Sequence, residues 1–399
     1  MRETDRRRLG LAMAGAMAAL MLTPGISSVA ALPGTIYLSE GGAVELPAST
    51  LLQAEIDGAR ASDTFTFSTG DSGSTALSYT LLGVLPVREV SLSVEPERRL
   101  VPGGQSVGIA IDTAGVVVIG ASDIGATASP ARLAGLRSGD IIQRVNGAAI
   151  GSAEQLSEQL EGDREVTLDV SRNGRPMTCR VTPAMDAKDG RWRLGAWVRD
   201  STAGVGTLTF IDPETGIYGA LGHAITDVDT SVAMPVGVGE LYENNVVDVT
   251  PGRQGKPGEL TGDFVFRPEA IGTVERNTER GIFGHSTRTQ RGLYSEGLPI
   301  AHRSELHTGP ASLLTSIDSG GPREYACEIV RVNGGDTRSM VVRVTDPALL
   351  ERTGGIVQGM SGSPILQDGR LIGAVTHVMI NDPAMGYGIS IDAMLEAAA

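Results

Sequence analysis

The sequence predicts a mainly β protein with several domains. The chain has 399 residues, which is enough for two or three domains. It contains 53 glycines, and short Val/Ile runs alternate with polar or glycine turns along much of its length. From residue 190 onward, no long amphipathic helix is indicated before Ala384–Ala399. We therefore expect strands and turns rather than helices to build the fold.

Charge and cysteine content exclude several functions. The chain has 33 Lys and Arg against 47 Asp and Glu, a net charge of -14. A nucleic-acid-binding surface needs clustered positive charge, so no nucleic-acid partner is expected. Two cysteines are too few for a disulfide scaffold or a cysteine-rich zinc fold, and we expect Cys179 and Cys327 to be free thiols.

Residues 1–32 have the composition of an export signal or membrane anchor. Arg6–Arg8 precede the apolar run Leu9–Leu22, and small residues follow. Positive charge stays on the inner side of a membrane, so the rest of the chain is expected on the outer side. We predict that the segment stays as an anchor. Cleavage as a signal peptide is the alternative.

Three folded regions are expected after this segment: a small β-module at residues 33–95, a second domain at 96–184 and a third at 190–399. The second region contains Ser129–Leu136, then Ser138–Ile142 and Val145–Gly147, an order of residues that resembles a PDZ domain. A turn with free N–H groups can capture a C-terminal carboxylate or a β-strand peptide. We predict this role for Ser106, Val107, Gly108 and Ile109. The alternative is a module that only packs against its neighbour.

The residues of the third region point to nucleophilic serine chemistry. Such chemistry needs a hydroxyl on a tight turn, N–H groups that hold an oxyanion, and a histidine that accepts the proton. Ser361 lies on the glycine-rich stretch Gly359–Ile365, and His223 follows a predicted strand. We predict Ser361 as the nucleophile, His223 as the base, and the N–H groups of Gly359 and Ser361 as the oxyanion hole.

Other serines fit this pattern less well. Ser319 lies in an Asp-Ser-Gly-Gly stretch, but two strand-like runs flank it and a hairpin turn explains its neighbours. Ser72 lies in a polar loop without a returning strand. Ser363 is followed by Pro364, and its offset from Gly359 favours Ser361 instead.

The stretch after Ser361 is similar to the pattern that follows the nucleophile in chymotrypsin-like peptidases. That similarity implies a double β-barrel, with His223 ending a strand of the first barrel. The carboxylate that orients the histidine stays open at this point, because spacing alone selects none of Asp248, Asp263 and Asp346. Fifteen extended residues span up to ~50 Å, so the position of Asp346 shortly before Ser361 does not exclude it.

Longer matching stretches resemble the stage IV sporulation protein B peptidase family, S55-type. They are Leu82–Val87, Pro102–Gly108, the PDZ-like segment, Gly219–Asp229 and Thr345–Ile365. The resemblance implies a chymotrypsin-like double β-barrel serine peptidase, preceded by a PDZ domain and a small β-module. It also implies the triad His223, Asp346 and Ser361, and it is the main reason for choosing Asp346.

The resemblance further implies a signalling role in endospore formation. It implies an anchored enzyme at the forespore inner membrane, facing the space between two membranes. Such an enzyme cleaves itself and a regulatory partner of an intramembrane metalloprotease complex, which triggers activation of a late sigma factor. No metal or organic cofactor is expected. The alternatives are a PDZ-bearing quality-control protease of the HtrA type and a non-catalytic scaffold.

Overall fold

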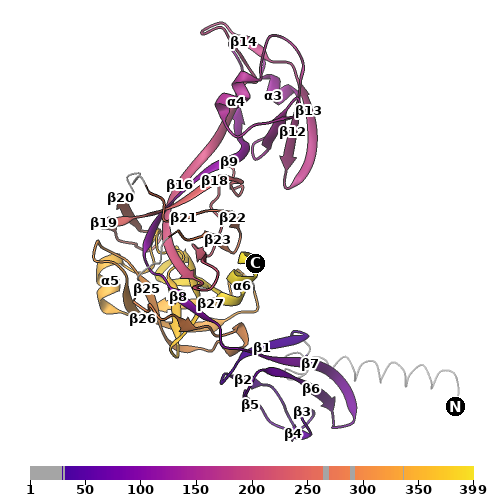
Figure 1. The fold of residues 1–399 in the computed structure, drawn as a ribbon, viewed down its shortest axis with the longest axis vertical. Helices are drawn as coiled ribbons and strands as arrows, with labels where there is room; N and C mark the ends of the chain where they lie inside the picture. Colours follow the sequence, from indigo (N-terminus) through magenta and orange to yellow (C-terminus); the bar gives the residue numbers. More distant parts are fainter. Residues whose placement is uncertain (1–28, 30–31, 264–268, 288–292, 336) are drawn as a thin grey trace, which may run out of the picture. The chain divides into compact units, whose positions relative to one another are not determined.

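The computed structural model describes residue 29 and residues 32–263, 269–287, 293–335 and 337–399 (Figure 1). Strands dominate throughout, which confirms the predicted mainly β fold. The chain divides into two units: the residues up to Arg98 with Pro299–Leu306, and Arg99–Leu298 with His307–Ala399. The predicted anchor lies outside the described residues except for Val29 and Leu32. Of the helices described, none is both long and apolar enough to span a membrane.

The first unit is a small β structure. Its elements are β1 (Thr35–Ser39), β2 (Ala43–Leu46), β3 (Leu52–Ile56), β4 (Ala59–Ala61), β5 (Phe65–Ser68), β6 (Gly73–Leu81), β7 (Leu85–Glu95) and the 3-10 helix η1 (Arg303–Glu305). Five strands form one sheet in the order β1-β7-β6-β3-β4, and β2 pairs with β5. Alternate residues of β3 are buried, as expected for a strand with one face on a core. Leu77, Tyr79, Val90 and Leu92 are fully buried in that core.

The second unit begins with the PDZ-like part of the chain. Its elements are β8 (Arg99–Pro102), β9 (Ser106–Ala121), α3 (Pro130–Leu133), β10 (Ile141–Val145), β11 (Ala148–Ala149), α4 (Ala153–Glu158), β12 (Val166–Arg172), β13 (Arg175–Val181), β14 (Ala184–Asp186), β15 (Arg191–Arg193) and β16 (Ala196–Ile211). Ser129 and Ser152 cap the two helices by accepting hydrogen bonds from N–H groups of the first turn. Asp140, 1% exposed in its side chain, pairs with Arg172 at 2.7 Å, so the buried carboxylate is compensated.

The rest of the second unit contains a closed barrel. The remaining elements are β17 (Ile217–Ala220), β18 (Val236–Glu243), β19 (Asn245–Thr250), β20 (Glu259–Asp263), β21 (Gly272–Thr273), β22 (Arg276–Thr278), β23 (Gly281–His285), β24 (Leu298–Pro299, which spans the unit boundary), β25 (Gly309–Thr315), β26 (Arg323–Val332), β27 (Met340–Val344), α5 (Pro347–Thr353), β28 (Pro364–Gln367), β29 (Arg370–Met379), β30 (Asp382–Ser390) and α6 (Ile391–Ala398). The barrel closes in the order β25-β26-β27-β30-β29-β28. The β25–β26 hairpin places Ser319 in its turn, so the turn predicted there is confirmed.

Two long strands connect the PDZ-like strands with the peptidase region. β9 and β16 pair antiparallel from Ser106 opposite Thr207 to Ala121 opposite Ala196. Both belong to a 13-stranded sheet that also contains β12 and β13 of the PDZ-like part and β17, β18 and β23. One sheet therefore contains strands of both predicted domains, while residues 184–193 between them form the separate β14–β15 pair.

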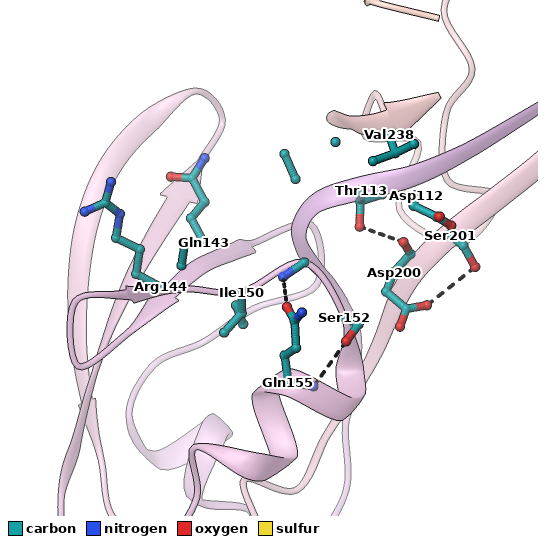
Figure 2. A pocket seen from close by; sticks show the side chains of 14 residues that line it. Asp112, Thr113, Gln143, Arg144, Ile150, Ser152, Gln155, Asp200, Ser201 and Val238 are labelled. Atoms are coloured by element: carbon teal, nitrogen blue, oxygen red, sulfur yellow. Dashed lines mark hydrogen bonds between the residues drawn. The ribbon is translucent and has the colours of Figure 1, made fainter. Parts of the chain in front are cut away.

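A large cavity lies where β9, β16 and β18 meet the start of α4 (Figure 2). Its volume is about 880 Å³. Thr113 donates a hydrogen bond to the carbonyl of Asp200 at 2.9 Å, and the Asp200 carboxylate accepts one from the N–H of Ala153 at 2.9 Å. Neither His223 nor Ser361 lines this cavity. Ser152 and Gln155 accept hydrogen bonds from the N–H groups of Gln155 and Gly151, and size alone does not make this cavity the candidate site.

Candidate active site

The turn around Ser361 is held in place by β16. The N–H of Thr207 donates to the carbonyl of Ser361 at 2.8 Å, and the Thr207 hydroxyl donates to the carbonyl of Gly359 at 2.8 Å. The Thr209 hydroxyl donates to the carbonyl of Gly362, also at 2.8 Å. A Cβ at Gly362 would lie 2.1 Å from the Thr207 carbonyl oxygen, so this position accepts only glycine. Three hydrogen bonds from one strand thus fix the backbone of the turn.

Two N–H groups of this turn are available for an oxyanion. The N–H groups of Met360, Gly362 and Ser363 donate to backbone carbonyls at 3.1, 2.7 and 3.0 Å. Within the part of the chain that the structure describes, the N–H groups of Gly359 and Ser361 have no acceptor. These are the two groups that the sequence analysis predicts as the oxyanion hole.

His223 follows strand β17 at a tight turn. The two residues before it, Leu221 and Gly222, both have positive φ, at 68° and 69°. Nδ1 of His223 lies 2.8 Å from the carbonyl oxygen of Ala224. Because a carbonyl oxygen only accepts, Nδ1 must carry the proton, which leaves Nε2 as a proton acceptor. Burial lowers the pKa of His223, and the hydrogen bond to Ala224 opposes that shift.

Ser361 and His223 line one cavity of about 410 Å³. In this conformation the Ser361 hydroxyl donates to the carbonyl of Thr376 at 2.6 Å rather than to His223. The imidazole of His377 lies beside that of His223, with ring centroids 4.8 Å apart. Burial, His223 and Arg338 lower the pKa of His377 to about 4, although part of the ring reaches solvent. Both rings are therefore neutral near pH 7, and they meet without charge repulsion.

Asp346 is placed on a helix end. Its carboxylate accepts hydrogen bonds from the N–H groups of Ala348 and Leu349 at 2.9 and 3.1 Å, which caps α5. It also accepts from the N–H of Ala326 at 3.3 Å. Among the described residues, the hydrogen bonds and ion pairs of Asp346 do not include His223. The structure therefore does not bring the predicted orienting carboxylate to the predicted base.

Other candidate carboxylates are also engaged elsewhere. Asp248 accepts from the N–H of Val249, and Asp263 lies on β20 opposite Asn245. Asp227 is buried and pairs with Arg199. Burial alone would raise the pKa of Asp227, but its hydrogen bonds and Arg199 outweigh burial and lower it. The group that contacts Nδ1 of His223 is thus a backbone carbonyl. Over the described residues, no cluster of three or more His, Cys, Asp or Glu could hold a metal ion.

Comparison with known proteins identifies the family. The SpoIVB peptidase S55 family matches residues 190–395, which is half of the chain and includes both His223 and Ser361. The chain belongs to the SpoIVB peptidase S55 family. It is therefore classed among serine peptidases. A PDZ domain matches residues 125–172 of this S55 peptidase, so the predicted PDZ domain is confirmed.

Other similarities of the S55 peptidase are more limited. It is 32% identical over 102 residues to the "Putative zinc metalloprotease LL2128" of Lactococcus lactis subsp. lactis (strain IL1403), a match that covers 25% of this chain and 22% of that protein. The Rv3671c protease in its inactive form is 15% identical, with 48% of this chain and 81% of that chain covered and a TM-score of 0.29. The active form from M. tuberculosis is 16% identical, with 49% and 72% covered and the same TM-score.

The predicted peptide-capturing loop of the S55 peptidase needs correction. Ser106, Val107, Gly108 and Ile109 are not in a PDZ loop: they open strand β9 and are buried. They pair with Gly204–Thr207 of β16 on one side, and Val107–Ile109 pair with Leu241–Glu243 of β18 on the other. A strand with neighbours on both edges cannot add a peptide strand. Ile109 instead lines the cavity that contains Ser361 and His223.

The structure shows a second groove in the PDZ region that the sequence analysis missed. A cavity of about 450 Å³ lies between α4 and the start of β16. Leu156 and Leu160 line one side, and Ala196–Val198 line the other. This end of β16 pairs only with β9 among the described strands, so its second edge is free. The sequence feature that indicates this groove is Leu194-Gly195-Ala196, in which a glycine between apolar residues directly precedes strand β16.

The groove also has backbone N–H groups that a carboxylate can use. The carbonyls of Leu194 and Gly195 accept hydrogen bonds from Ala131 and Ser122, whereas the N–H groups of Leu194 and Gly195 have no acceptor among the described residues. Lys188 and Arg193 line the same groove, but so do Asp123 and Asp186, and Arg193 pairs with Asp186 and Asp189. The free N–H groups, rather than a positive charge, match the requirements for capturing a peptide C-terminus.

Proposed function

We propose that this chain is an exported, membrane-anchored serine endopeptidase with Ser361 as nucleophile and His223 as general base. The observation that carries the proposal is that these two residues, far apart in sequence, line one cavity inside the region that matches the S55 family. The residues 1–32 support export and anchoring by their basic and apolar composition.

The mechanism follows from the hydrogen bonds of the two residues. Nδ1 of His223 donates to Ala224, so Nε2 takes the Ser361 proton once the hydroxyl turns away from the Thr376 carbonyl. The serine oxygen then bonds to the scissile carbonyl carbon, and the oxyanion accepts from the N–H groups of Gly359 and Ser361. His223 returns the proton to the leaving amine. A water, activated the same way, then hydrolyses the acyl-enzyme.

The third member of the catalytic set differs from the one that the resemblance implies. We propose that the Ala224 carbonyl orients His223 and fixes its tautomer, and that Asp346 serves as the cap of α5. The supporting observations are the 2.8 Å contact at Nδ1 and the two N-cap hydrogen bonds of Asp346. A neutral carbonyl stabilises the imidazolium less than a carboxylate does, which agrees with the lowered pKa of His223.

We further propose that the enzyme acts in endospore formation by cleaving itself and a regulatory partner of an intramembrane metalloprotease complex, at the forespore inner membrane. The family match supports this role. A PDZ groove with two free N–H groups supports selection of the partner by its C-terminus. Such selection favours a narrow substrate range over general degradation.

The test compares the full chain with its Ser361→Ala and His223→Ala variants. We expect each variant to lose about 10⁴-fold or more in peptide cleavage and self-processing, because the two residues act as a unit. The control is Ser319→Ala, in the β25–β26 turn, which should leave both activities intact. Retained cleavage by Ser361→Ala would refute the catalytic assignment. Broad degradation of unfolded casein by the parent chain would refute the signalling role and favour quality control.

A further inference from the structure

The turn between β6 and β7 carries an exposed apolar patch. We define this hairpin patch as Leu51, Leu82, Val84, Leu85 and Val87. The exposed fractions at the tip are 61% for Leu82, 79% for Val84 and 60% for Leu85. Leu51 lies beside the tip because its carbonyl accepts from the N–H of Leu82 at 2.7 Å. The turn contains no charged residue. A contiguous patch of exposed apolar side chains is typical of a surface that contacts a membrane, a ligand or another protein.

The backbone conformation of the turn does not favour the leucine that occupies its tip. Leu82 and Gly83 have φ of 54° and 70°, the left-handed conformation of a tight hairpin turn. Gly and Asn adopt this conformation readily, whereas a bulky side chain is strained there. Strain of this kind persists where a side chain is needed for function. The Leu82 side chain therefore points to a role beyond the turn itself.

The point where the chain enters the first unit indicates what the hairpin patch contacts. Arg88 of β7 donates a hydrogen bond to the carbonyl of Leu32, the residue that closes the predicted anchor segment. The hairpin is thus fastened to the point where the chain leaves its apolar N-terminal stretch. We propose that the hairpin patch inserts into the same lipid bilayer that holds residues 1–32. This inference rests on the membrane attachment put forward under the proposed function.

The chemistry of the patch favours lipid over a protein partner. The patch is a protruding turn with apolar side chains and no charged group, and a bilayer accepts such a tip without a complementary pocket. The turn carries no charged residue, so attraction to anionic lipids is not expected to drive its insertion. Insertion should therefore depend on the apolar side chains and should change little when anionic lipid is added. Insertion would hold the small unit against the membrane surface.

The test places a fluorescent probe on the tip of the full chain. Cys179 and Cys327 are buried free thiols, so a Val84→Cys variant can be labelled selectively with an environment-sensitive dye. The matched control is Ala59→Cys, an exposed position beside the β3–β4 turn, at the other end of the same sheet. Both proteins are mixed with phosphatidylcholine vesicles, with and without phosphatidylglycerol. Dye emission and quenching by bromine-labelled acyl chains are measured, and flotation with the vesicles is recorded.

The outcomes separate this inference from the anchor on which it rests. We expect the dye at position 84 to shift to the blue and to be quenched by the acyl chains, whereas the dye at position 59 is unaffected. If the full chain floats with vesicles but both dyes report water, the hairpin proposal is wrong and the anchor stands. If the chain does not float at all, the anchor is wrong and so is this inference. A blue shift that grows with protein concentration in lipid-free detergent, without acyl-chain quenching, would assign the patch to a second copy and overturn the proposal.

A second variant keeps the test independent of folding. Leu82→Asn relieves the left-handed strain, so the melting temperature should not fall. Combined with Leu85→Ser on the Val84→Cys chain, it should lower acyl-chain quenching at least tenfold, since each large apolar side chain contributes more than about one power of ten to burial in an apolar phase. Quenching equal to that of the parent would contradict the proposal.

Discussion

Replacing Thr207 by valine tests whether β16 sets the geometry of the active site. The Thr207 hydroxyl donates to the carbonyl of Gly359 at 2.8 Å, and the side chain is 1% exposed. Valine has the same shape and is favoured in strands, so Thr207→Val removes only the hydroxyl. The Gly359 carbonyl then loses its donor, and the peptide that links Gly359 to Met360 keeps only the hydrogen bond from the Met360 N–H to the Val357 carbonyl.

The size of the effect follows from that lost hydrogen bond. Leaving a partly buried carbonyl without its partner costs up to ~3 kcal/mol, which is up to about 150-fold in an equilibrium or a rate. Loss of a whole oxyanion donor costs about 10²–10³ in kcat. Because the affected peptide adjoins Gly359, whose N–H is one of the two predicted oxyanion groups, we expect Thr207→Val to lower kcat by about 10- to 100-fold. KM should change by less than about threefold, since the substrate contacts are kept.

Two matched variants control for folding. Thr207→Ser keeps the hydroxyl and should restore most of kcat. Thr315→Val makes the same change at another fully buried position, on β25, where the threonine hydroxyl has no hydrogen-bond partner among the described residues. It should leave kcat unchanged. The assay is steady-state cleavage of a peptide substrate, with melting temperatures for all three variants.

The reasoning fails if Thr207→Val keeps kcat within twofold of the parent. It also fails if Thr207→Ser is as impaired as Thr207→Val, because the methyl group and not the hydroxyl would then matter. Equal losses in kcat for Thr207→Val and Thr315→Val would show a general effect of core substitution.

Three further predictions concern the base, the helix cap and the PDZ groove. Asp346→Asn should keep kcat within about threefold, because asparagine caps helices as well as aspartate does; a loss of 10³-fold or more would restore Asp346 to the catalytic set. The acid limb of kcat/KM against pH should have its midpoint below about 6.5, because burial lowers the pKa of His223 and the neutral ring is the base; a midpoint above 7 would indicate a carboxylate at His223. Both tryptophans, Trp192 and Trp197, line the PDZ groove, so a bound peptide should change their emission, and amidation of the peptide C-terminus should weaken binding at least tenfold; equal binding of acid and amide would exclude carboxylate capture.

The sequence points to Ser361 and His223 as the candidate catalytic pair because the signals for both residues are local. Ser361 lies among glycines that the turn requires, and His223 directly follows a strand, so each can be found without knowing the fold. Asp346 shows the opposite case. An Asp followed by Pro347 is also the start signal of a helix, and the structure gives it that role.

The position of the peptide groove could not be predicted in the same way. Val107–Ile111 has the pattern of a strand, and that pattern fits a PDZ strand and a peptidase strand equally well. The strand in fact runs for 16 residues, far longer than the usual five or six, and Gly115 lies within it at a positive φ of 104°. In the sequence, Gly115 interrupts the apolar pattern and so suggests a boundary between two strands. In the structure, it lies inside one continuous strand. The edge available for a peptide therefore lies on β16, at the far end of the domain in sequence.

Strand β16 carries both the free edge of the groove and the residues that hold the Ser361 turn. Ala196–Val198 of β16 form the free edge of the groove, and Thr207 and Thr209 of the same strand hold the turn that carries Ser361. Between these ends, β16 pairs with β9 and has irregularities after Trp197 and after Arg199. A paired strand cannot slip by one residue without moving its whole set of side chains to the opposite face, so a peptide added at the edge acts on a strand whose register is fixed. The Ser361 hydroxyl donates to the Thr376 carbonyl, and the hydrogen bond to His223 that the proposed mechanism uses requires this hydroxyl to turn away. The strand that lines the proposed peptide groove is thus also the strand whose hydrogen bonds hold the turn of the proposed nucleophile.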